Sequence, residues 1–527
     1  MKTKQQYFYN ALLLTVVTLL MRTVSVGFNV YVSGKVGAEA MGLLSLVSGV
    51  YGFAVTLATS GIHLATVRTF AERLKLSGGA ENRKCLCACL SYAAFFGSLA
   101  SILLFALARP IGLYVLKDAR TVRALTMLAF TLFPIAVSAV FNGYFTAMRR
   151  AYKNAIAQVT EQAVKITFTG YLLVLVAPNT VEGSILAILM GGAVSETLTF
   201  LLNLVLYVLD KRHFKGIKQQ KSGSKINVAA IALPVAISAY MRSGLLTIEH
   251  ILIPRGLQAY GAGNSAALAA YGTLHGMALP VILYPAAILS SFSALLIPEI
   301  TEQNTIGNKR EIRYIAGRAY QAALLFSIGT AAVMLFLSGE LGEVLYGSSE
   351  VGRFIKLLAP LIPIMYIDTA TDALLKGLGE QVYSMNVNII DALISVILVW
   401  LLVPHMGING YLVTIYVTEI LNASFSICRL LKVSGYRPKI VSLFVRPLFA
   451  AISATVIANL LLHCFTVCAS TAATLVLHIV LVTALYIALL LLTRTLPASD
   501  VKWLSASLLG TDKTRFFAHK QADEGLE

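Results

Sequence analysis

Residues 226–253 read INVAAIALPVAISAYMRSGLLTIEHILI and carry only two charged side chains, Arg242 and Glu249. A membrane-spanning helix needs about 20 predominantly apolar residues, and residues 6–31, QYFYNALLLTVVTLLMRTVSVGFNVY, meet that need with one charge, Arg22. A charge at the centre of a membrane helix costs about 2.5–3.5 kcal/mol, so it usually faces a water-filled cavity or a partner. Both arginines lie roughly 16 residues into their helices, about 24 Å along the axis. We therefore expect two cations at one depth, in a cavity that receives an anion.

The rest of the chain repeats this apolar pattern and predicts an all-α polytopic membrane protein. Of the 527 residues, 57% are hydrophobic and only 13% are charged. Asp, Glu, Lys and Arg are absent from four long runs, 85–108, 124–148, 256–298 and 447–493. Counting stretches of membrane-spanning length predicts about fourteen helices. The first stretch is too long for a cleaved signal peptide and is interrupted by Arg22.

The net charge of +17 follows from the expected topology. With both termini in the cytoplasm, Lys and Arg fall mainly in segments on the cytoplasmic side, as the positive-inside rule requires. These segments are 68–84, 149–153, 211–225, 309–318, 429–439 and the C-terminal tail. Membrane orientation explains the basic balance better than nucleic-acid binding, so we expect a multi-pass membrane protein with both termini in the cytoplasm and no nucleic-acid partner.

An internal repeat appears at an offset near 230 residues. Residues 42–72, GLLSLVSGVYGFAVTLATSGIHLATVRTFAE, parallel residues 272–302, GTLHGMALPVILYPAAILSSFSALLIPEITE. At the same offset Glu161 corresponds to Asp391. Each half contains an even number of predicted helices, so both insert in the same orientation as a parallel repeat, and transporters of that type bind substrate between their halves.

The repeat sets the expected domain boundaries. Residues 1–210 form an N-terminal six-helix lobe, and residues 226–432 form a C-terminal one. The basic segment 211–225, KRHFKGIKQQKSGSK, is the linker between them. Two additional helices occupy 433–493, and 494–527 are a cytoplasmic tail.

Several segments resemble those of a known transporter family. They are Arg22 with GAEAMGL at 37–43, EQAVKI at 161–166, ALP at 232–234 with MRS at 241–243, YG at 271–272 with GMALP at 276–280, and LIPEI at 296–300. Together these segments are similar to the stage V sporulation protein B branch of the polysaccharide flippases, within the multidrug/oligosaccharidyl-lipid/polysaccharide exporter superfamily. The similarity extends over nearly the whole chain.

The resemblance implies a flippase for a lipid-linked oligosaccharide, such as an undecaprenyl-pyrophosphate-linked peptidoglycan precursor, in cell-wall or spore-cortex synthesis. It also implies that cavity arginines, here Arg22 and Arg242, hold the pyrophosphate. Some relatives bind a sodium ion among acidic and Asn residues of the second lobe, a part that Glu249, Asn388 and Asp391 would play here. No cofactor is expected beyond a coupling cation, Na⁺ or H⁺.

The other polar residues of the predicted helices have competing interpretations. Glu249 follows Arg242 by seven residues, two turns along one helix face, so it either neutralises Arg242 until substrate arrives or forms a fixed ion pair. Glu161 and Lys165 are an i,i+4 pair in the favourable order, either structural or part of the cavity. Asp391 has no such local cation, because Ser395 stands where Lys165 stands in the first half.

A second set of polar residues is expected to pack or gate. Glu196 and Glu419 occupy equivalent places in the two halves, within SETL at 195–198 and TEIL at 418–421. Asp368 and Asp372 lie at the cytoplasmic end of a helix and predict an entrance or interface cluster. Three histidines of the predicted helices, His63, His250 and His275, are isolated in sequence and are interpreted as packing residues.

Three other functions compete with the flippase. A cation-coupled multidrug exporter of the same superfamily favours acidic and aromatic cavities, which two intramembrane arginines oppose. A membrane glycosyltransferase or polymerase carries catalytic acids in sizeable outer loops, and the outer segments here are short. A non-transporting scaffold for wall-synthesis enzymes leaves the paired arginines unexplained. The chain has no GxxxxGK[ST] pattern, so we expect no direct use of ATP and no enzymatic activity.

Overall fold

The computed structural model describes residues 2–77, 82–148, 150–176, 180–211, 228–436, 441–464, 471–493 and 495. Within these ranges every regular element is a helix. The first half contains α1 (Lys2–Thr59), α2 (Ile62–Ser77), α3 (Asn82–Pro110), η1 (Ile111–Val115), α4 (Arg120–Ala129), α5 (Leu132–Ala147), α6 (Ala151–Val176) and α7 (Val181–Lys211).

The second half begins after the 211–225 segment, of which only Lys211 is among the described residues. It contains α8 (Val228–Ala259), α9 (Asn264–Tyr271), η3 (Gly272–Ala278), α10 (Leu279–Leu283), α11 (Ala286–Ile306), α12 (Lys309–Phe336), α13 (Ser338–Tyr346), α14 (Ser349–Leu358), η4 (Ala359–Leu361), α15 (Ile362–Gly377), α16 (Gln381–Met406) and α17 (Ile408–Ser434). After it come η5 (Val441–Val445), α18 (Arg446–Cys464) and α19 (Thr471–Leu492).

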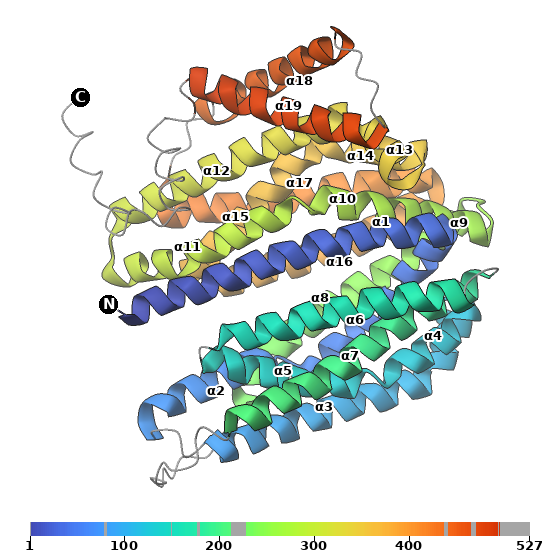
Figure 1. The fold of residues 1–527 in the computed structure, drawn as a ribbon, viewed down its shortest axis with the longest axis vertical. Coiled ribbons are helices and arrows are strands. Elements are labelled where there is room, and N and C mark those ends of the chain that lie inside the picture. The colour runs from blue at the N-terminus through green and yellow to red at the C-terminus, as the bar shows by residue number, and fades with distance from the viewer. Residues whose placement is uncertain are drawn as a thin grey trace.

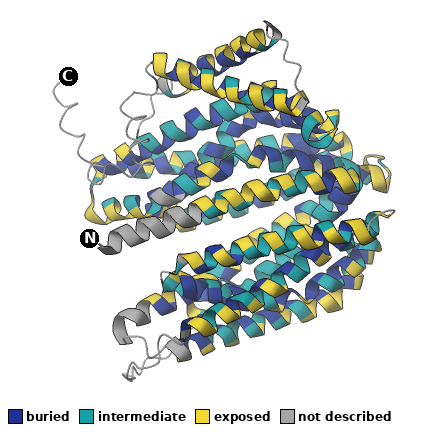
Figure 2. Cartoon of the chain, viewed as in Figure 1, coloured by how far each residue is buried: buried dark blue, intermediate teal, exposed yellow. Residues whose placement is uncertain are grey.

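The polytopic all-α prediction is confirmed. The described residues contain 11 helices long and apolar enough to cross a membrane, or up to 12 if α4 and α5, which meet at 42°, form one span. The expected number of about fourteen is close to this but is not confirmed. Large apolar side chains lie exposed on the outer faces of the bundle, among them Phe449, Val476 and Leu492 (Figure 2). A lipid surrounding explains such exposure, which water would penalise.

Helix α1 is one example of how the sequence shapes the bundle. Its 58 residues would extend about 87 Å as a straight helix, nearly three times the roughly 30 Å hydrocarbon core. The helix is broken at Gly37, where φ is 79° and ψ is 174°, a conformation that is accessible to glycine because it lacks a Cβ. Figure 1 shows the first part of α1 running from the N terminus to the end of the molecule where α9 lies. We call the former end the N-terminal face and the latter the opposite face.

The two repeats meet at a pair of glycines that the sequence repeat aligns with each other. A Cβ on Gly42 would lie 1.9 Å from the carbonyl oxygen of Leu268, and a Cβ on Gly272 would lie 2.1 Å from that of Ala38. Such close backbone approach is how small residues join membrane helices. Equivalent positions of two repeats contact each other only near the axis that relates them. Both segments run from the opposite face toward the N-terminal face, so the repeat is parallel.

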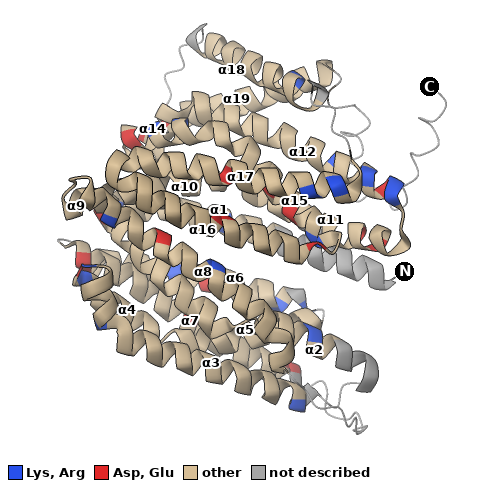
Figure 3. Ribbon diagram, turned by 180° about the vertical axis from the view of Figure 1, so that it is seen from behind, with Lys and Arg blue, Asp and Glu red and all other residues tan. Residues whose placement is uncertain are grey.

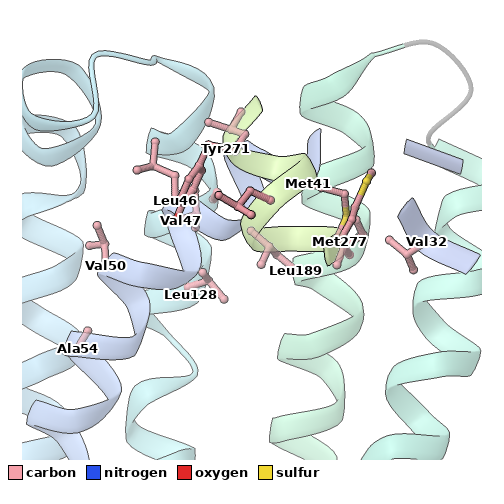
Figure 4. Packing of buried hydrophobic residues seen from close by; sticks show 14 of the residues in the cluster. Val32, Met41, Leu46, Val47, Val50, Ala54, Leu128, Leu189, Tyr271 and Met277 are labelled. Atoms are coloured by element: carbon pink, nitrogen blue, oxygen red, sulfur yellow. The ribbon is translucent and has the colours of Figure 1, made fainter. Parts of the chain in front are cut away.

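The buried apolar core surrounds this contact and joins the two halves. Met41 and Leu46 from α1 pack with Tyr271 and Met277 from the second half, and Leu189 of α7 lies in the same cluster (Figure 4). Figure 1 shows α2–α7 on one side of the molecule, α11–α17 on the other, and α18 and α19 outside them. The exact boundaries 1–210, 226–432 and 433–493 stay predictions, and the tail 494–527 lies outside the described residues except for Thr495.

Candidate functional site

Arg22 lies in the first part of α1 with its side chain exposed. Its neighbour Thr23 shares a 2.9 Å hydrogen bond with the hydroxyl of Tyr284, which precedes α11. The Arg22 guanidinium is within electrostatic reach of Tyr366 on α15. Tyr366 is itself fixed, because its hydroxyl donates a 2.7 Å hydrogen bond to the carbonyl of Ile282. The first part of α1 thus places its charge against the second half of the chain.

Arg242 is also exposed and lies near the middle of α8. It is within electrostatic reach of Asp368 on α15, Asp391 on α16 and Glu419 on α17. Asp368 is two residues from Tyr366, the residue that faces Arg22. The two arginines that the sequence singled out thus both act on α15, at residues two positions apart whose side chains leave the helix in different directions. Figure 3 shows how few other charges lie away from the two ends of the bundle.

Several side-chain oxygen atoms around Arg242 have no hydrogen-bond partner among the described residues. The side-chain amide of Asn422 donates a 3.2 Å hydrogen bond to Oδ2 of Asp368. Oδ1 of Asp368, Oδ1 of Asp391 and Oδ1 of Asn422 are buried with no hydrogen-bond partner among the described residues. A buried polar atom without a partner is unfavourable, and three oxygens from α15, α16 and α17 suit a hard cation or a proton.

Glu249 belongs to the same region, two turns from Arg242 along α8, and forms no ion pair with it among the described residues. Its carboxylate is buried, accepts a hydrogen bond from Ser395 and is within electrostatic reach of Asp391. The charges that surround Arg242 come instead from three neighbouring helices. Asn388 donates its amide N–H to the backbone carbonyl of Ser384 at 2.8 Å, which leaves its oxygen as the group to face a cation.

Asp372, one turn beyond Asp368, has its own partners. The Ser384 hydroxyl donates to it at 2.6 Å, and Lys376 lies 4.0 Å away. Among the described residues, no three His, Cys, Asp or Glu side chains are grouped closely enough to hold a metal ion. A cation near Asp391 would therefore be held by a mixed set of carboxylate and neutral oxygens.

The first half contains a matching cluster that includes its own lysine. Glu161 and Lys165 on α6 interact as the i,i+4 spacing predicts, and both are within electrostatic reach of Glu196 on α7. Glu196 in turn faces Tyr51 of α1, whose hydroxyl shares a 2.5 Å hydrogen bond with Thr131. The expected pair is thus part of a group of three charged residues. Glu161, the repeat equivalent of Asp391, has Lys165 beside it on its own helix. The cation near Asp391 is Arg242, which comes from another helix.

At the opposite face, sequence reasoning missed a polar network that joins the two halves. Arg255, near the end of α8, donates to the backbone carbonyls of Tyr114 at 2.9 Å and of Val115, both at the end of η1. Asp118 accepts hydrogen bonds from the Arg120 side chain at 2.6 and 3.0 Å and from its backbone N–H at 2.9 Å. Burial opposes the charged form of Asp118, but these hydrogen bonds outweigh it and hold its pKa below the ordinary value.

The sequence carried little signal for this network. Asp118 and Arg120 are two residues apart in a short segment between helices, and Glu39, which binds the same guanidinium at 2.8 Å, is 81 residues earlier. The backbone carbonyls that bind Arg255 are exposed by the π-helical turn η1, because a π-helix shifts the ordinary hydrogen-bond register. Neither feature has a recognisable spacing along the chain.

Comparisons with known proteins agree with this architecture. A model of the polysaccharide biosynthesis protein family matches residues 8–304, and the MatE model matches residues 259–401. Stage V sporulation protein B of Bacillus subtilis (strain 168) is 26% identical over 416 residues, which are 77% of this chain and 80% of the relative. Lipid II flippase MurJ of the same organism is 23% identical over 458 residues, 81% and 83% of the two chains.

Solved structures with the same fold are more distant in sequence. Lipid II flippase MurJ in an inward closed conformation superimposes with a TM-score of 0.69 at 13% identity, covering 92% of this chain and 99% of that chain. The inward-facing conformation of a multidrug resistance MATE family transporter of the MOP superfamily gives 0.63 at 14% identity, covering 81% and 100%. At these identities the likeness shows the fold.

Proposed function

This chain belongs to the polysaccharide biosynthesis protein family, and from that premise we propose that it is a flippase for a lipid-linked oligosaccharide. In this proposal the substrate is an undecaprenyl-pyrophosphate oligosaccharide or peptidoglycan precursor, moved across a bacterial cytoplasmic membrane by alternating access of the two halves. Both termini lie in the cytoplasm, and the process served is cell-wall or spore-cortex synthesis. Stage V sporulation protein B and lipid II flippase MurJ, its relatives, support this choice of substrate class.

The presence of two arginines within membrane-spanning stretches, Arg22 on α1 and Arg242 on α8, each within electrostatic reach of α15, is the observation that carries the proposal. Pyrophosphate presents several anionic oxygens, and a guanidinium can bind two of them at once through its forked donors. A lysine keeps the charge but loses that geometry. Charge-assisted hydrogen bonds contribute about 1.5–3 kcal/mol each, so two arginines acting together are enough to select a pyrophosphate head group over a neutral one.

The cluster of oxygens around Asp391 is the proposed coupling site. Asp391, Asn388 and Glu249 supply ligands for Na⁺ or acceptors for H⁺, with Asp368 and Asn422 adjoining them. Pyrophosphate and cation moving together reduce the net charge that crosses the membrane, and each elementary charge moved is worth about 2.3 kcal/mol per 100 mV. An ion gradient can thus bias the cycle without ATP.

The remaining predicted residues have supporting parts in this proposal. Glu161 and Lys165, together with Glu196, form the polar wall of the first half that faces the substrate. Glu419 and Asp368 hold Arg242 between transport cycles, and Asp372 anchors α15 to α16 at the entrance.

A cation-coupled multidrug exporter is the second candidate. The MatE model matches 259–401, which includes Asp368 and Asp391, and a carboxylate cluster suits organic cations. This function leaves the two arginines unexplained. A role as a scaffold for wall-synthesis enzymes also leaves them unexplained.

The test is flipping of a labelled undecaprenyl-pyrophosphate oligosaccharide in proteoliposomes. We expect Arg22→Lys and Arg242→Lys each to lower the rate about tenfold or more, since about 1.4 kcal/mol corresponds to a factor of ten. Arg123→Lys is the matched control, because the Arg123 side chain is 77% exposed and pairs with Glu182 at the opposite face. Normal flipping by the double lysine variant would overturn the proposed site.

The coupling ion has a separate assay in the same vesicles. Asp391→Asn should abolish the dependence of flipping on a Na⁺ or H⁺ gradient while the protein still binds substrate. If the gradient dependence of Asp391→Asn equals that of the unmodified protein, Asp391 is not the coupling residue. Efflux of organic cations with no flipping of the glycolipid would favour the exporter instead.

A further inference from the structure

Two of the histidines that are isolated in sequence meet in the structure. The ring of His250, on α8, lies 4.6 Å from the ring of His275, on η3, at 84° between the planes. Tyr271, at the end of α9, stacks on His275 with centroids 5.2 Å apart. The hydroxyl of Tyr271 shares a 2.8 Å hydrogen bond with Nδ1 of His250. Three titratable rings thus form one cluster, which we call the His–Tyr cluster (His250, Tyr271 and His275).

The local backbone explains why these rings meet. His275 lies within η3, a seven-residue π-helix, and a π-helical turn rotates the following side chains relative to an α-helix. Such turns are rare and frequently mark functional sites. The turn directs His275 toward α8, where His250 lies one residue after the buried Glu249.

The His–Tyr cluster lies against the contact between the two repeats. A Cβ on Gly49 of α1 would lie 3.2 Å from the Cβ and from the ring of His250. A Cβ on Gly276, the residue after His275, would lie 3.2 Å from the Cβ of Met41. Tyr271 immediately precedes Gly272, the repeat-equivalent partner of Gly42. The backbone of α1 therefore packs closely against the half-buried rings and limits the space for water around them.

The groups that face the cluster are mostly apolar, with one chain of titratable residues leading away from it. Glu249 of α8 is within electrostatic reach of Tyr271, and the buried Tyr411 of α17 is within reach of both. Glu249 is in turn close to Asp391 of α16. From α1 the facing residues are Met41, Ser45 and Gly49. The buried face of α14, which also packs on η3, is Val351, Gly352, Phe354, Ile355 and Leu358, so its charged residues Glu350, Arg353 and Lys356 point away.

We propose that the His250–His275 pair is a proton-binding site whose occupancy controls the α1–η3 contact between the two repeats. The proposal deepens the proposed function and rests on it, because it identifies where a proton would act on the alternating-access movement. It adds a site at the contact itself, distinct from the carboxylate oxygens of α15–α17.

One added proton changes the hydrogen bond between His250 and Tyr271. In the neutral pair, the Tyr271 O–H donates to Nδ1 of His250, or Nδ1–H donates to the Tyr271 oxygen. When His250 is protonated, both ring nitrogens carry N–H groups, so Tyr271 can only accept. The second ring, 4.6 Å away, cannot also be charged without strong repulsion. The neutral pair therefore takes up only one additional proton.

Protonation works against the contact because of solvation. An imidazolium with little water and no direct ion pair is unfavourable, and the close backbone at Gly49 limits the hydration of His250. Separation of α1 from η3 hydrates the ring and restores the ordinary affinity for a proton. By linkage, acid therefore favours the separated state and a neutral pair favours the closed contact seen here.

The experiment measures the contact in the full-length protein without substrate. Spin labels at Lys117→Cys and Ser265→Cys, in a background with the six native cysteines replaced by serine, report the separation of the two halves at the opposite face. We expect a longer-distance population to grow as the pH falls from about 7.5 to about 5, the range in which histidine side chains change charge.

Variants assign the proton to the pair. His250→Gln with His275→Gln should remove the pH-dependent population, and Tyr271→Phe, which preserves the packing of the ring, should shift its midpoint. His63→Gln on α2, an exposed position, is the control and should behave as the unmodified protein. An unshifted distance distribution in the unmodified protein, or the same shift in the double glutamine variant, would overturn the proposal.

The result is separable from the proposed function. Arginine-dependent flipping of the glycolipid with no pH-dependent separation would reject the proton site and leave the flippase intact. A pH-dependent separation that needs the two histidines, in a protein that does not flip the glycolipid, would support the proton site and reject the substrate.

Discussion

Replacement of Asp210 by asparagine should destabilise the folded protein by about 3 kcal/mol. Asp210 is 2% exposed at the end of α7. Its Oδ1 lies 2.5 Å from Nζ of Lys153 and contacts Nη1 of Arg150, and its Oδ2 accepts a 3.0 Å hydrogen bond from Tyr144. At an effective dielectric constant of about 20, opposite charges 2.5 Å apart attract by about 7 kcal/mol. The cost of desolvating both ions offsets much of that attraction.

Of the two cations that remain, the buried Lys153 sets most of the loss, because Arg150 is partly exposed. Removal of one partner of a buried ion pair costs about 3–5 kcal/mol, because the other charge stays buried without compensation. Lys153 keeps its hydrogen bond to the carbonyl of Leu206 at 3.1 Å and its position over the ring of Phe145 at 5.1 Å. We therefore expect a value near the lower end. Equilibrium unfolding by sodium dodecyl sulfate in mixed micelles gives the free-energy difference.

Two further variants make the result decisive. Glu182→Gln breaks an exposed pair with Arg123, whose side chains are 34% and 77% exposed, and should cost less than about 1 kcal/mol. Adding Lys153→Met to Asp210→Asn removes the uncompensated lysine and should restore part of the loss. If Asp210→Asn unfolds at the same detergent fraction as Glu182→Gln, the buried network contributes no more than a surface pair and the reasoning fails.

Two other predictions concern the contact between the halves. Gly42→Ala should destabilise the protein and disturb the repeat contact, since its Cβ would meet the Leu268 carbonyl oxygen at 1.9 Å. Gly52→Ala, whose Cβ would meet nothing within 4 Å, should instead stabilise its helix by up to about 1 kcal/mol. Equal thermal stability of the two variants would refute this. Asp118 has a lowered pKa in the folded protein because Arg120 hydrogen-bonds it despite burial, so its stabilising effect is present above the unfolded value of about 3.9 and is lost as pH falls through the folded value. Asp118→Asn should therefore lower the thermal unfolding midpoint at neutral pH and reduce its fall in acid, and a midpoint unchanged at neutral pH would contradict the assignment.

The membrane class and the repeat could be predicted from the sequence because both depend on local patterns of residues. Hydropathy depends on composition within one stretch, and a charge inside such a stretch, such as Arg22 or Arg242, stands out without any knowledge of the fold. The repeat also aligned Gly42 with Gly272 before their contact was known. Even so, the number of spanning helices was only approximate, because helices that continue through a kink, as Val16–Ala71 does at Gly37, count as one candidate span.

Contacts between distant segments could not be predicted in the same way. His250 and His275 are 25 positions apart, and only the π-helical register of η3 turns one toward the other. Glu249 illustrates the same limit, because its two-turn spacing from Arg242 indicated an ion pair. In the structure Ser395 and Asp391, from another helix, are the neighbours of its carboxylate.

The asymmetry between the two halves gives the proposed coupling a physical basis. In the first half Lys165 stays beside Glu161 on its own helix, so that cluster keeps its compensating charge at every stage. In the second half the position of that lysine is Ser395, and Asp391 relies on Arg242 from α8. On the proposed function a pyrophosphate competes with these carboxylates for Arg242. A carboxylate that loses its cation in a membrane becomes unfavourable, so it must gain a Na⁺ or a proton. Substrate binding and cation uptake are then coupled, because the negative charge of Asp391 must stay compensated. The second half, which lacks an equivalent of Lys165, is where the cation must bind.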